Sequence, residues 1–142
     1  MSQENVERIR NAFAGTTAGD FSYLPSLIDD TCEFLLPPDF PGTQATRGPG
    51  GFVSVVREFE EAFEGMRYEP EDFLDQGDRL FVAVRTIGRA KHTGIAVDLI
   101  LYWVYTFRDR MVVRMEAFLD RAPALEAVGL SDQDAHASPD PP

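Results

Sequence analysis

Residues 66–119, MRYEPEDFLDQGDRLFVAVRTIGRAKHTGIAVDLILYWVYTFRDRMVVRMEAFL, carry the clearest structural pattern in the chain, because apolar and polar residues alternate along much of their length. A repeat of two is typical of β-strands, whose successive side chains point to opposite faces of a sheet. Turn-forming residues interrupt the repeat at 76–78, 92–94 and 108–110. The pattern therefore predicts an antiparallel meander of strands at about 66–75, 79–91, 95–107 and 111–119.

Helical spacing of apolar residues predicts three helices ahead of this meander. Val6, Ile9 and Phe13 share one face of a helix over residues 2–14, which Gly19 can end. A shorter helix is expected from residue 20 or 22 to residue 28. Its buried side is formed by Tyr23, Leu24, Leu27 and Ile28. A third helix follows the run Gly48-Pro49-Gly50-Gly51, and its apolar face is formed by Phe52, Val56, Phe59 and Phe63.

The remaining segments complete one expected domain. Residues 31–36 have the composition of a strand, which the proline-rich segment 37–42 ends; this segment is a candidate lid. Residues 122–128 predict a short helix. Residues 131–142 contain three acids, no bases and three prolines, which is typical of a flexible tail. We therefore expect a single domain over residues 1–130.

Composition narrows the possible partners. The net charge is −11, from 13 Lys and Arg against 24 Asp and Glu, which disfavours nucleic acid and anionic membranes. Cys32 is the sole cysteine, so no disulfide can form within the chain. The apolar run from Ile100 to Tyr105 is far too short to span a membrane, and the first residues are acidic, unlike a signal peptide. We expect a cytoplasmic protein.

The order helix, helix, strand, helix, meander resembles the cone-shaped α+β fold of the nuclear-transport-factor-2-like superfamily, a cystatin-like roll. In that fold a curled antiparallel sheet wraps around three N-terminal helices. The segments that resemble its SnoaL-like branch are Arg47-Gly48, Asp75-Gln76-Gly77-Asp78, Gly88-Arg89, Thr93-Gly94, Thr106-Phe107-Arg108-Asp109, Phe118-Leu119-Asp120-Arg121 and residues 124–130. Together they span about residues 3–130. Arg110 departs from the family pattern, which usually has Gly there, and a positive φ would strain it.

The resemblance implies a deep, mostly apolar pocket between the sheet and the helices, but it does not fix a reaction. The family contains polyketide cyclases, and the superfamily contains ketosteroid isomerases, limonene epoxide hydrolases, scytalone dehydratases and non-catalytic dimerisation modules. Ketosteroid isomerases use a carboxylate base, a Tyr and a protonated Asp. The aligned positions here hold Leu35, Ala12 and Trp103.

The other known chemistries are also poorly matched. The carboxylates and Arg of the epoxide hydrolases align near Val84, Thr86 and Ala117, and a shift of one residue to Arg85 or Glu116 would turn each side chain to the other face. The dehydratases need two pocket histidines. His92 lies in an expected turn and His136 in the expected tail. We therefore carry none of these mechanisms over.

Glu33 is the leading candidate for an acid or base. If Leu35 faces the pocket, as the resemblance implies, the repeat of two turns Glu33 inward and Cys32, Phe34 and Leu36 outward. A carboxyl group in an apolar pocket has a raised pKa and can transfer protons near neutral pH. The alternative is a Glu at the rim or one paired with Arg85.

The other expected pocket residues are apolar or aromatic. Trp103 and Tyr105 can stack on a flat ligand and donate hydrogen bonds, although plain core packing is the commoner role of such residues. Thr86 can offer its hydroxyl to a ligand as one hydrogen bond. The alternative is an ordinary strand residue whose hydroxyl is already hydrogen-bonded within the protein. The full expected lining is Phe13, Leu35, Phe52, Phe59, Val84, Thr86, Leu101, Trp103, Tyr105, Met115 and Ala117.

Three functions remain open. The first is a cofactor-independent isomerase, cyclase or hydrolase that uses Glu33 on a small hydrophobic molecule. The second is a protein that binds such a molecule without chemistry. The third is a homodimerisation module that pairs through the outer sheet face, formed by Ile100, Tyr102, Val104 and Phe118. The glycine-rich run lacks the Lys-Ser/Thr of a phosphate-binding loop, and no metal-ligand cluster is present, so we expect no cofactor and no metal.

Overall fold

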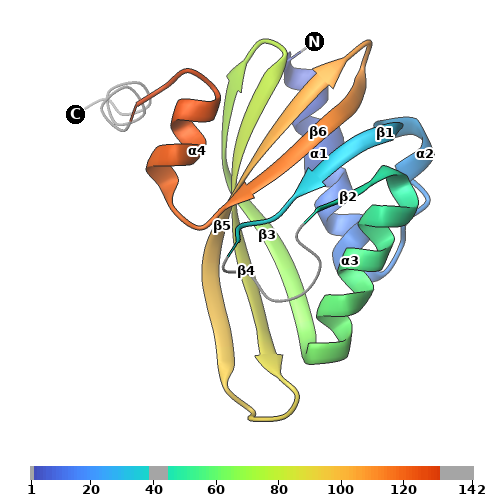
Figure 1. Cartoon of the computed structure of the whole chain (residues 1–142), viewed down its shortest axis with the longest axis vertical. Helices are drawn as coiled ribbons and strands as arrows, with labels where there is room; N and C mark the ends of the chain where they lie inside the picture. Colours follow the sequence, from blue (N-terminus) through green and yellow to red (C-terminus); the bar gives the residue numbers. More distant parts are fainter. Residues whose placement is uncertain (1, 39–44, 132–142) are drawn as a thin grey trace.

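The predicted meander forms most of a six-stranded sheet in the computed structural model, which describes residues 2–38 and 45–131. The four meander strands are β3 (Phe63–Gln76), β4 (Arg79–Ala90), β5 (Ala96–Arg108) and β6 (Met111–Phe118). Each pairs antiparallel with the next, as predicted. The strands are long and the sheet twists strongly (Figure 1), which leaves a concave inner face.

Two more strands extend the sheet beyond β6. The strand β1 (Ile28–Leu35) pairs parallel with β6, and β2 (Ala45–Arg47) pairs antiparallel with β1. The order across the sheet is β2-β1-β6-β5-β4-β3. The sequence did not predict β2, because a strand of three residues is too short to show alternation.

Helices cover both faces of the sheet. On the inner side lie α1 (Ser2–Ala18), α2 (Leu24–Leu27) and α3 (Gly48–Ala62), and on the outer side lies α4 (Arg121–Ala127), as Figure 1 shows. The first helix is one turn longer than predicted and ends before Gly19, which adopts φ +78°. The second helix is shorter than predicted because the chain is already extended at Ile28, where β1 begins.

The main core lies between the inner face and the helices. It includes Ile9 and Phe13 of α1, Leu27 of α2, and Val82 and Val112 of the sheet. A second cluster lies under α4, where Ala124, Leu125 and Val128 pack on Phe81, Ala83 and Val104, with Ile100, Tyr102 and Phe118 half-buried beside them. The chain's own α4 thus covers part of the face expected to form a homodimer, and dimerisation stays a prediction.

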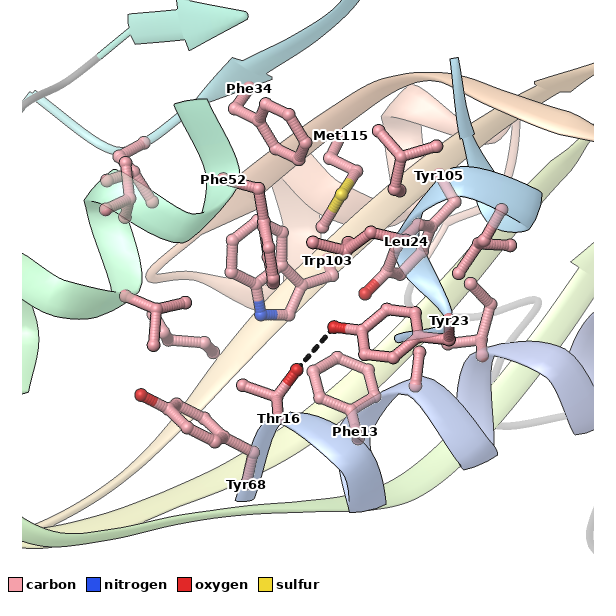
Figure 2. Close-up of a pocket in the computed structure, with 18 of the residues that line it drawn as sticks. Phe13, Thr16, Tyr23, Leu24, Phe34, Phe52, Tyr68, Trp103, Tyr105 and Met115 are labelled. Carbon is pink, nitrogen blue, oxygen red and sulfur yellow. Dashed lines mark hydrogen bonds between the residues drawn. The ribbon is translucent and has the colours of Figure 1, made fainter. Parts of the chain in front are cut away.

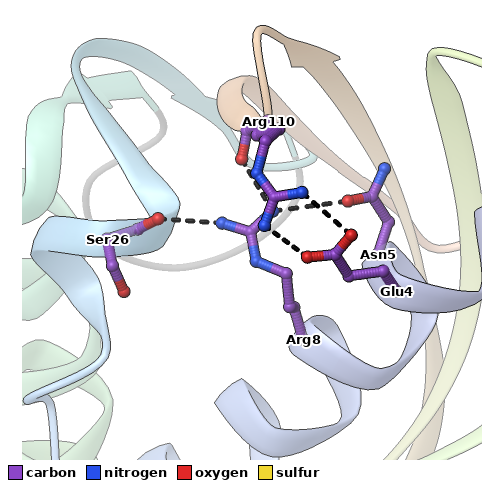
Figure 3. Close-up of polar contacts among 5 residues, drawn as sticks. All are labelled: Glu4, Asn5, Arg8, Ser26 and Arg110. Atoms are coloured by element: carbon purple, nitrogen blue, oxygen red, sulfur yellow. Dashed lines mark hydrogen bonds and ion pairs between the residues drawn. The ribbon is translucent and has the colours of Figure 1, made fainter. Parts of the chain in front are cut away.

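The turn between β5 and β6 has a positive φ at Arg110, the condition under which this departure from the family pattern would be strained. Asp109 and Arg110 adopt φ 52° and 70°, which is unusual for residues other than Gly. The Arg8 guanidinium holds the turn by donating to the carbonyl of Arg110 at 2.7 Å and to that of Ser26 at 2.8 Å (Figure 3). Arg110 in turn binds the Glu4 carboxylate and lowers its pKa. These contacts tie the turn to α1.

No helix within the described ranges is long and apolar enough to cross a membrane.

Candidate functional site

A pocket lies between the concave face of the sheet and α1, α2 and α3, where the resemblance places one (Figure 2). The open space within it is narrow, with a volume of about 60 Å³ available to the centre of a water molecule. Residues from both helical and strand elements line it. The expected residues that do so are Phe13, Phe52, Phe59, Leu101, Trp103, Tyr105 and Met115.

Four expected lining residues do not reach the pocket. Val84 is fully buried within the core, and Thr86 is buried with its hydroxyl donating to the carbonyl of Val84 at 3.3 Å. Ala117 packs against Leu36, Val55 and Trp103 and is not among the residues that line the pocket. Leu35 faces the opposite side of the sheet, beside Glu33.

The predicted orientation of Glu33 is wrong, because the residues of β1 that face inward are the alternate ones. Cys32, Phe34 and Leu36 are buried, and Phe34 and Leu36 line the pocket, so Glu33 points to the outer face with its side chain 44% exposed. Burial of an apolar face is favoured over burial of a carboxylate, which would lose its hydration. The resemblance to the family implied that Leu35 faces inward. The predicted orientations of the neighbouring residues 32–36 were all derived from that assignment.

Two outer arginines hold the Glu33 carboxylate. Its oxygens lie 3.2 Å from Arg114 and 3.7 Å from Arg47. Arg85, the partner considered from the sequence, instead forms a two-fold contact with Asp98 at 2.6 and 2.9 Å. Glu33 therefore has solvent and cationic partners, and it does not reach the pocket.

Aromatic rings form the walls of the pocket. Tyr105 meets Phe13 edge-on and Trp103 at a tilt, each with ring centres 6.4 Å apart. Phe34 of β1 and Phe52 of α3 also contact each other, with ring centres 5.4 Å apart. Such walls favour a flat or ring-containing ligand, which can stack on faces and edges.

Hydrogen-bonding groups gather at one end of the pocket. The hydroxyls of Thr16 and Tyr23 are 2.5 Å apart, and Figure 2 shows the Trp103 indole nitrogen and the Tyr105 hydroxyl pointing toward this pair. Burial raises the pKa of Tyr23 to about 12 and that of Tyr105 well above its usual range. All four groups are therefore uncharged at neutral pH, and we call them the donor end.

Tyr68 of β3 contributes a separate polar group. Its hydroxyl is buried and has no hydrogen-bond partner among the described residues. Burial raises its pKa to about 12. Its backbone N–H donates to the Thr17 hydroxyl at 3.1 Å, which fixes this part of β3 against α1.

Some of these residues had a signal in the sequence and others had none. Tyr23 belonged to the predicted buried side of the second helix. Thr16 continues the helical spacing of Ile9 and Phe13 by one more turn, so extending that helix would have included it. Tyr68 lies on a strand in which exposed and half-buried residues intermix, and the pattern did not single it out.

The lining is uncharged. Among the described residues that line the pocket, none is Asp, Glu, His, Lys, Arg or Cys. Cys32 lies nearby but is fully buried, and burial raises its pKa to about 12. Nor do the described residues contain three or more His, Cys, Asp or Glu side chains grouped to hold a metal ion. The described part of the lining therefore presents neutral hydroxyl and indole groups and no carboxylate, imidazole, amine or thiolate that could act as a general base.

The positions that align with catalytic residues of the related enzymes place no acidic or basic side chain in the pocket. Ala12 and Trp103 line the pocket, whereas Leu35, Val84, Thr86 and Ala117 do not. His92 is exposed in the turn between β4 and β5. His136 lies outside the described residues, as do most of the candidate lid and all but the first residue of the expected tail.

Comparison with known proteins establishes the family. Residues 6–115 match the model of the SnoaL-like domain, whereas no curated protein matches the chain. The crystal structure of TerC co-crystallised with polyporic acid is 25% identical, with 82% of this chain and 91% of TerC covered and a TM-score of 0.71.

Proteins described as NTF2-like give the same architecture. One from Burkholderia xenovorans LB400 is 26% identical, with 84% and 92% of the two chains covered and a TM-score of 0.72. One from Burkholderia thailandensis E264 is 20% identical, with 82% and 90% covered and a TM-score of 0.74, a likeness of fold. The chain therefore belongs to the SnoaL-like family and has the NTF2-like fold.

Proposed function

We propose that this protein binds a small, uncharged, largely apolar molecule and holds one of its oxygen atoms at the donor end. The observation that carries the proposal is the chemistry of the lining. Among the described lining residues, the polar side chains are the hydroxyls of Thr16, Tyr23, Tyr68 and Tyr105 and the indole of Trp103, and none of these is ionised at neutral pH.

The pocket disfavours a charged ligand. A carboxylate or phosphate inside it would lose its hydration without gaining a cationic partner from the described lining. The net charge of −11 adds a general repulsion of anions. A carbonyl oxygen carries no net charge and accepts hydrogen bonds from Trp and Tyr donors, which makes a cyclic or aromatic ketone the best match.

The comparison with TerC supports a small-molecule occupant. TerC was co-crystallised with polyporic acid, and 91% of TerC aligns with this chain.

Binding without turnover is favoured over the acid-base enzyme considered from the sequence. Proton abstraction needs a base within hydrogen-bond reach of the substrate, and Glu33 lies on the outer face. The polar groups of the described lining are neutral hydroxyls and one indole, and none of them is a carboxylate or an imidazole. Release of an isomerised or cyclised product at a steady rate would contradict the proposal and favour a cyclase or isomerase role.

Three probes of similar shape test the ligand class. Acetophenone has a carbonyl, α-methylstyrene replaces its oxygen with CH₂, and benzoate carries a charge. We expect acetophenone to bind more tightly than α-methylstyrene by roughly 2- to 10-fold, the worth of one net hydrogen bond. We expect benzoate to bind most weakly. Isothermal titration calorimetry measures the affinities, and Trp103, the sole tryptophan, reports occupancy of the pocket by fluorescence.

Two variants locate the binding site. Trp103→Phe removes the indole donor and should reduce the preference for acetophenone over α-methylstyrene. Glu33→Gln should leave both affinities unchanged, because its carboxylate lies outside the pocket. Tightest binding by benzoate, or loss of binding in Glu33→Gln, would refute the proposal.

A further inference from the structure

The Tyr68 hydroxyl is a buried polar group without a partner. Its oxygen is shielded from solvent, and no described residue accepts or donates a hydrogen bond to it. Buried polar groups in folded proteins almost always have a partner, because leaving one unpaired costs the free energy of its lost hydration. An unpaired hydroxyl that also lines a pocket calls for a functional explanation.

The fold keeps this hydroxyl away from the donor end. The hydrogen bond from the Tyr68 backbone to Thr17 anchors β3 against α1. In Figure 2 the Tyr68 hydroxyl points away from the hydroxyls of Thr16 and Tyr23, which are already paired with each other. The pocket therefore presents polar groups in two directions.

The adjoining helix offers Tyr68 no partner. The side chains that α3 contributes to the lining are Phe52, Val55, Val56 and Phe59, none of which bears a hydrogen-bonding group. Glu60 of the same helix is close enough to raise the pKa of Tyr68, but it makes no hydrogen bond to the hydroxyl. The hydroxyl is therefore open to an oxygen of a molecule that enters the pocket.

We propose that Tyr68 is a specificity-determining residue that selects ligands with a second oxygen function. This inference rests on the proposed function and narrows its ligand class: an apolar ring or ring system with one oxygen at the donor end and a hydroxyl or carbonyl that reaches Tyr68. Because a phenolic hydroxyl both donates and accepts, either kind of oxygen can pair with it.

Pairs of probes that differ in one group test this inference. In 4′-hydroxyacetophenone and 4′-methylacetophenone, and in the corresponding 3′ pair, a hydroxyl replaces a methyl group of similar size. Calorimetry at pH 6.5, where the phenols are uncharged, gives their affinities for the wild-type protein and for Tyr68→Phe. In the wild type we expect the hydroxyl member of at least one pair to bind roughly 2- to 10-fold more tightly than its methyl partner.

Tyr68→Phe should abolish that preference and leave the affinity for the methyl compounds within about twofold of the wild type. Tyr102→Phe is the matched control, because Tyr102 packs near α4 on the outer face and should not affect the preference. Urea denaturation without ligand provides a second readout. Tyr68→Phe should be at least as stable as the wild type, since it removes an unpaired buried group.

The outcomes separate this inference from the proposed function. If the acetophenones bind and Tyr68→Phe keeps the hydroxyl preference, or if no such preference exists in the wild type, the role of Tyr68 is refuted while the proposed function stands. If Tyr68→Phe is clearly less stable than the wild type, the hydroxyl already has a partner and the inference also fails. If no probe binds either protein, the proposed function and the inference fail together.

Discussion

Replacing Thr16 with valine tests the hydrogen bond that organises the donor end of the pocket. Thr16 is buried, and its hydroxyl lies 2.5 Å from that of Tyr23. Valine keeps the branched shape but has no hydroxyl, so the substitution leaves the Tyr23 oxygen without this partner while the packing is preserved.

The expected loss of stability follows from the burial of both groups. Leaving a buried donor or acceptor unpaired costs about 1–3 kcal/mol. Tyr23 borders a cavity that can admit water, which places Thr16→Val in the lower part of this range, at about 1–2 kcal/mol. For a domain of this size that corresponds to a fall in the unfolding temperature of roughly 3–8 °C.

Urea denaturation of a double-mutant cycle measures the pairwise contribution. Tyr23→Phe alone should cost about 0.5–1.5 kcal/mol, because the Thr16 hydroxyl can then donate to a carbonyl of its own helix. The double variant Thr16→Val/Tyr23→Phe should lose less than the sum of the single variants, with a coupling of about 0.5–1.5 kcal/mol. Additive losses, with no measurable coupling, would refute the hydrogen bond.

The same tyrosine predicts a pH dependence. Burial raises the pKa of Tyr23 to about 12, against about 10 in an unfolded chain. Its contribution to stability is therefore complete below pH 10 and is lost as the pH rises toward 12, because the unfolded chain ionises first. Between these two pKa values, each such tyrosine lowers the free energy of unfolding by up to about 1.4 kcal/mol per pH unit. Tyr23→Phe should reduce the slope measured by urea denaturation between pH 10 and 12, and an unchanged slope would contradict the assignment.

Three further predictions concern the scaffold. Urea denaturation should show Gly50→Ala stabilised by up to about 1 kcal/mol, since its new Cβ meets nothing within 4 Å. Gly48→Ala should be destabilised, because φ is +76° and the Cβ would lie 2.8 Å from the Asp30 carbonyl oxygen; similar shifts in both variants would contradict this reasoning. Arg110→Gly should raise the melting temperature by relieving a positive φ, and a decrease would mean that the lost ion pair with α1 matters more. The buried Cys32 thiol, whose pKa burial raises to about 12, should react with Ellman's reagent only after unfolding, and rapid reaction of the native protein would show that it is accessible.

The strands of the meander were predictable because their signal is local. Alternation along residues 66–119 specified four strands whose ends agree with β3 to β6 within a few residues. At Arg110 the family resemblance pointed to a position that usually holds Gly, and φ is positive there. Leu101, Trp103 and Tyr105 were assigned to the pocket because one correct inward residue on β5 fixes all the others on that face.

The candidate site on β1 could not be predicted in the same way. Alternation shows that Glu33 and Leu35 share one face and that Phe34 and Leu36 share the other, but it does not show which face is inside. That orientation depends on parallel pairing with β6 and on the packing of α3 against β1, which join residues distant in sequence. At the donor end, Thr16 and Tyr23 are only seven residues apart, but Trp103 and Tyr105 of β5 reach this pair through packing between residues distant in sequence.

Short-range periodicity in the amino-acid sequence was sufficient to specify most of the strands and helices. The resemblance to known families then indicated the NTF2-like fold, the SnoaL-like family and most of the aromatic walls. Packing between residues distant in sequence determined which polar side chains face the pocket. It turned the Glu33 carboxylate outward to Arg114 and Arg47, and it brought uncharged donors together inside. The physical reason is that burying an apolar face is favourable whereas burying an unpaired carboxylate is costly, and only the assembled sheet and helices define which face is buried.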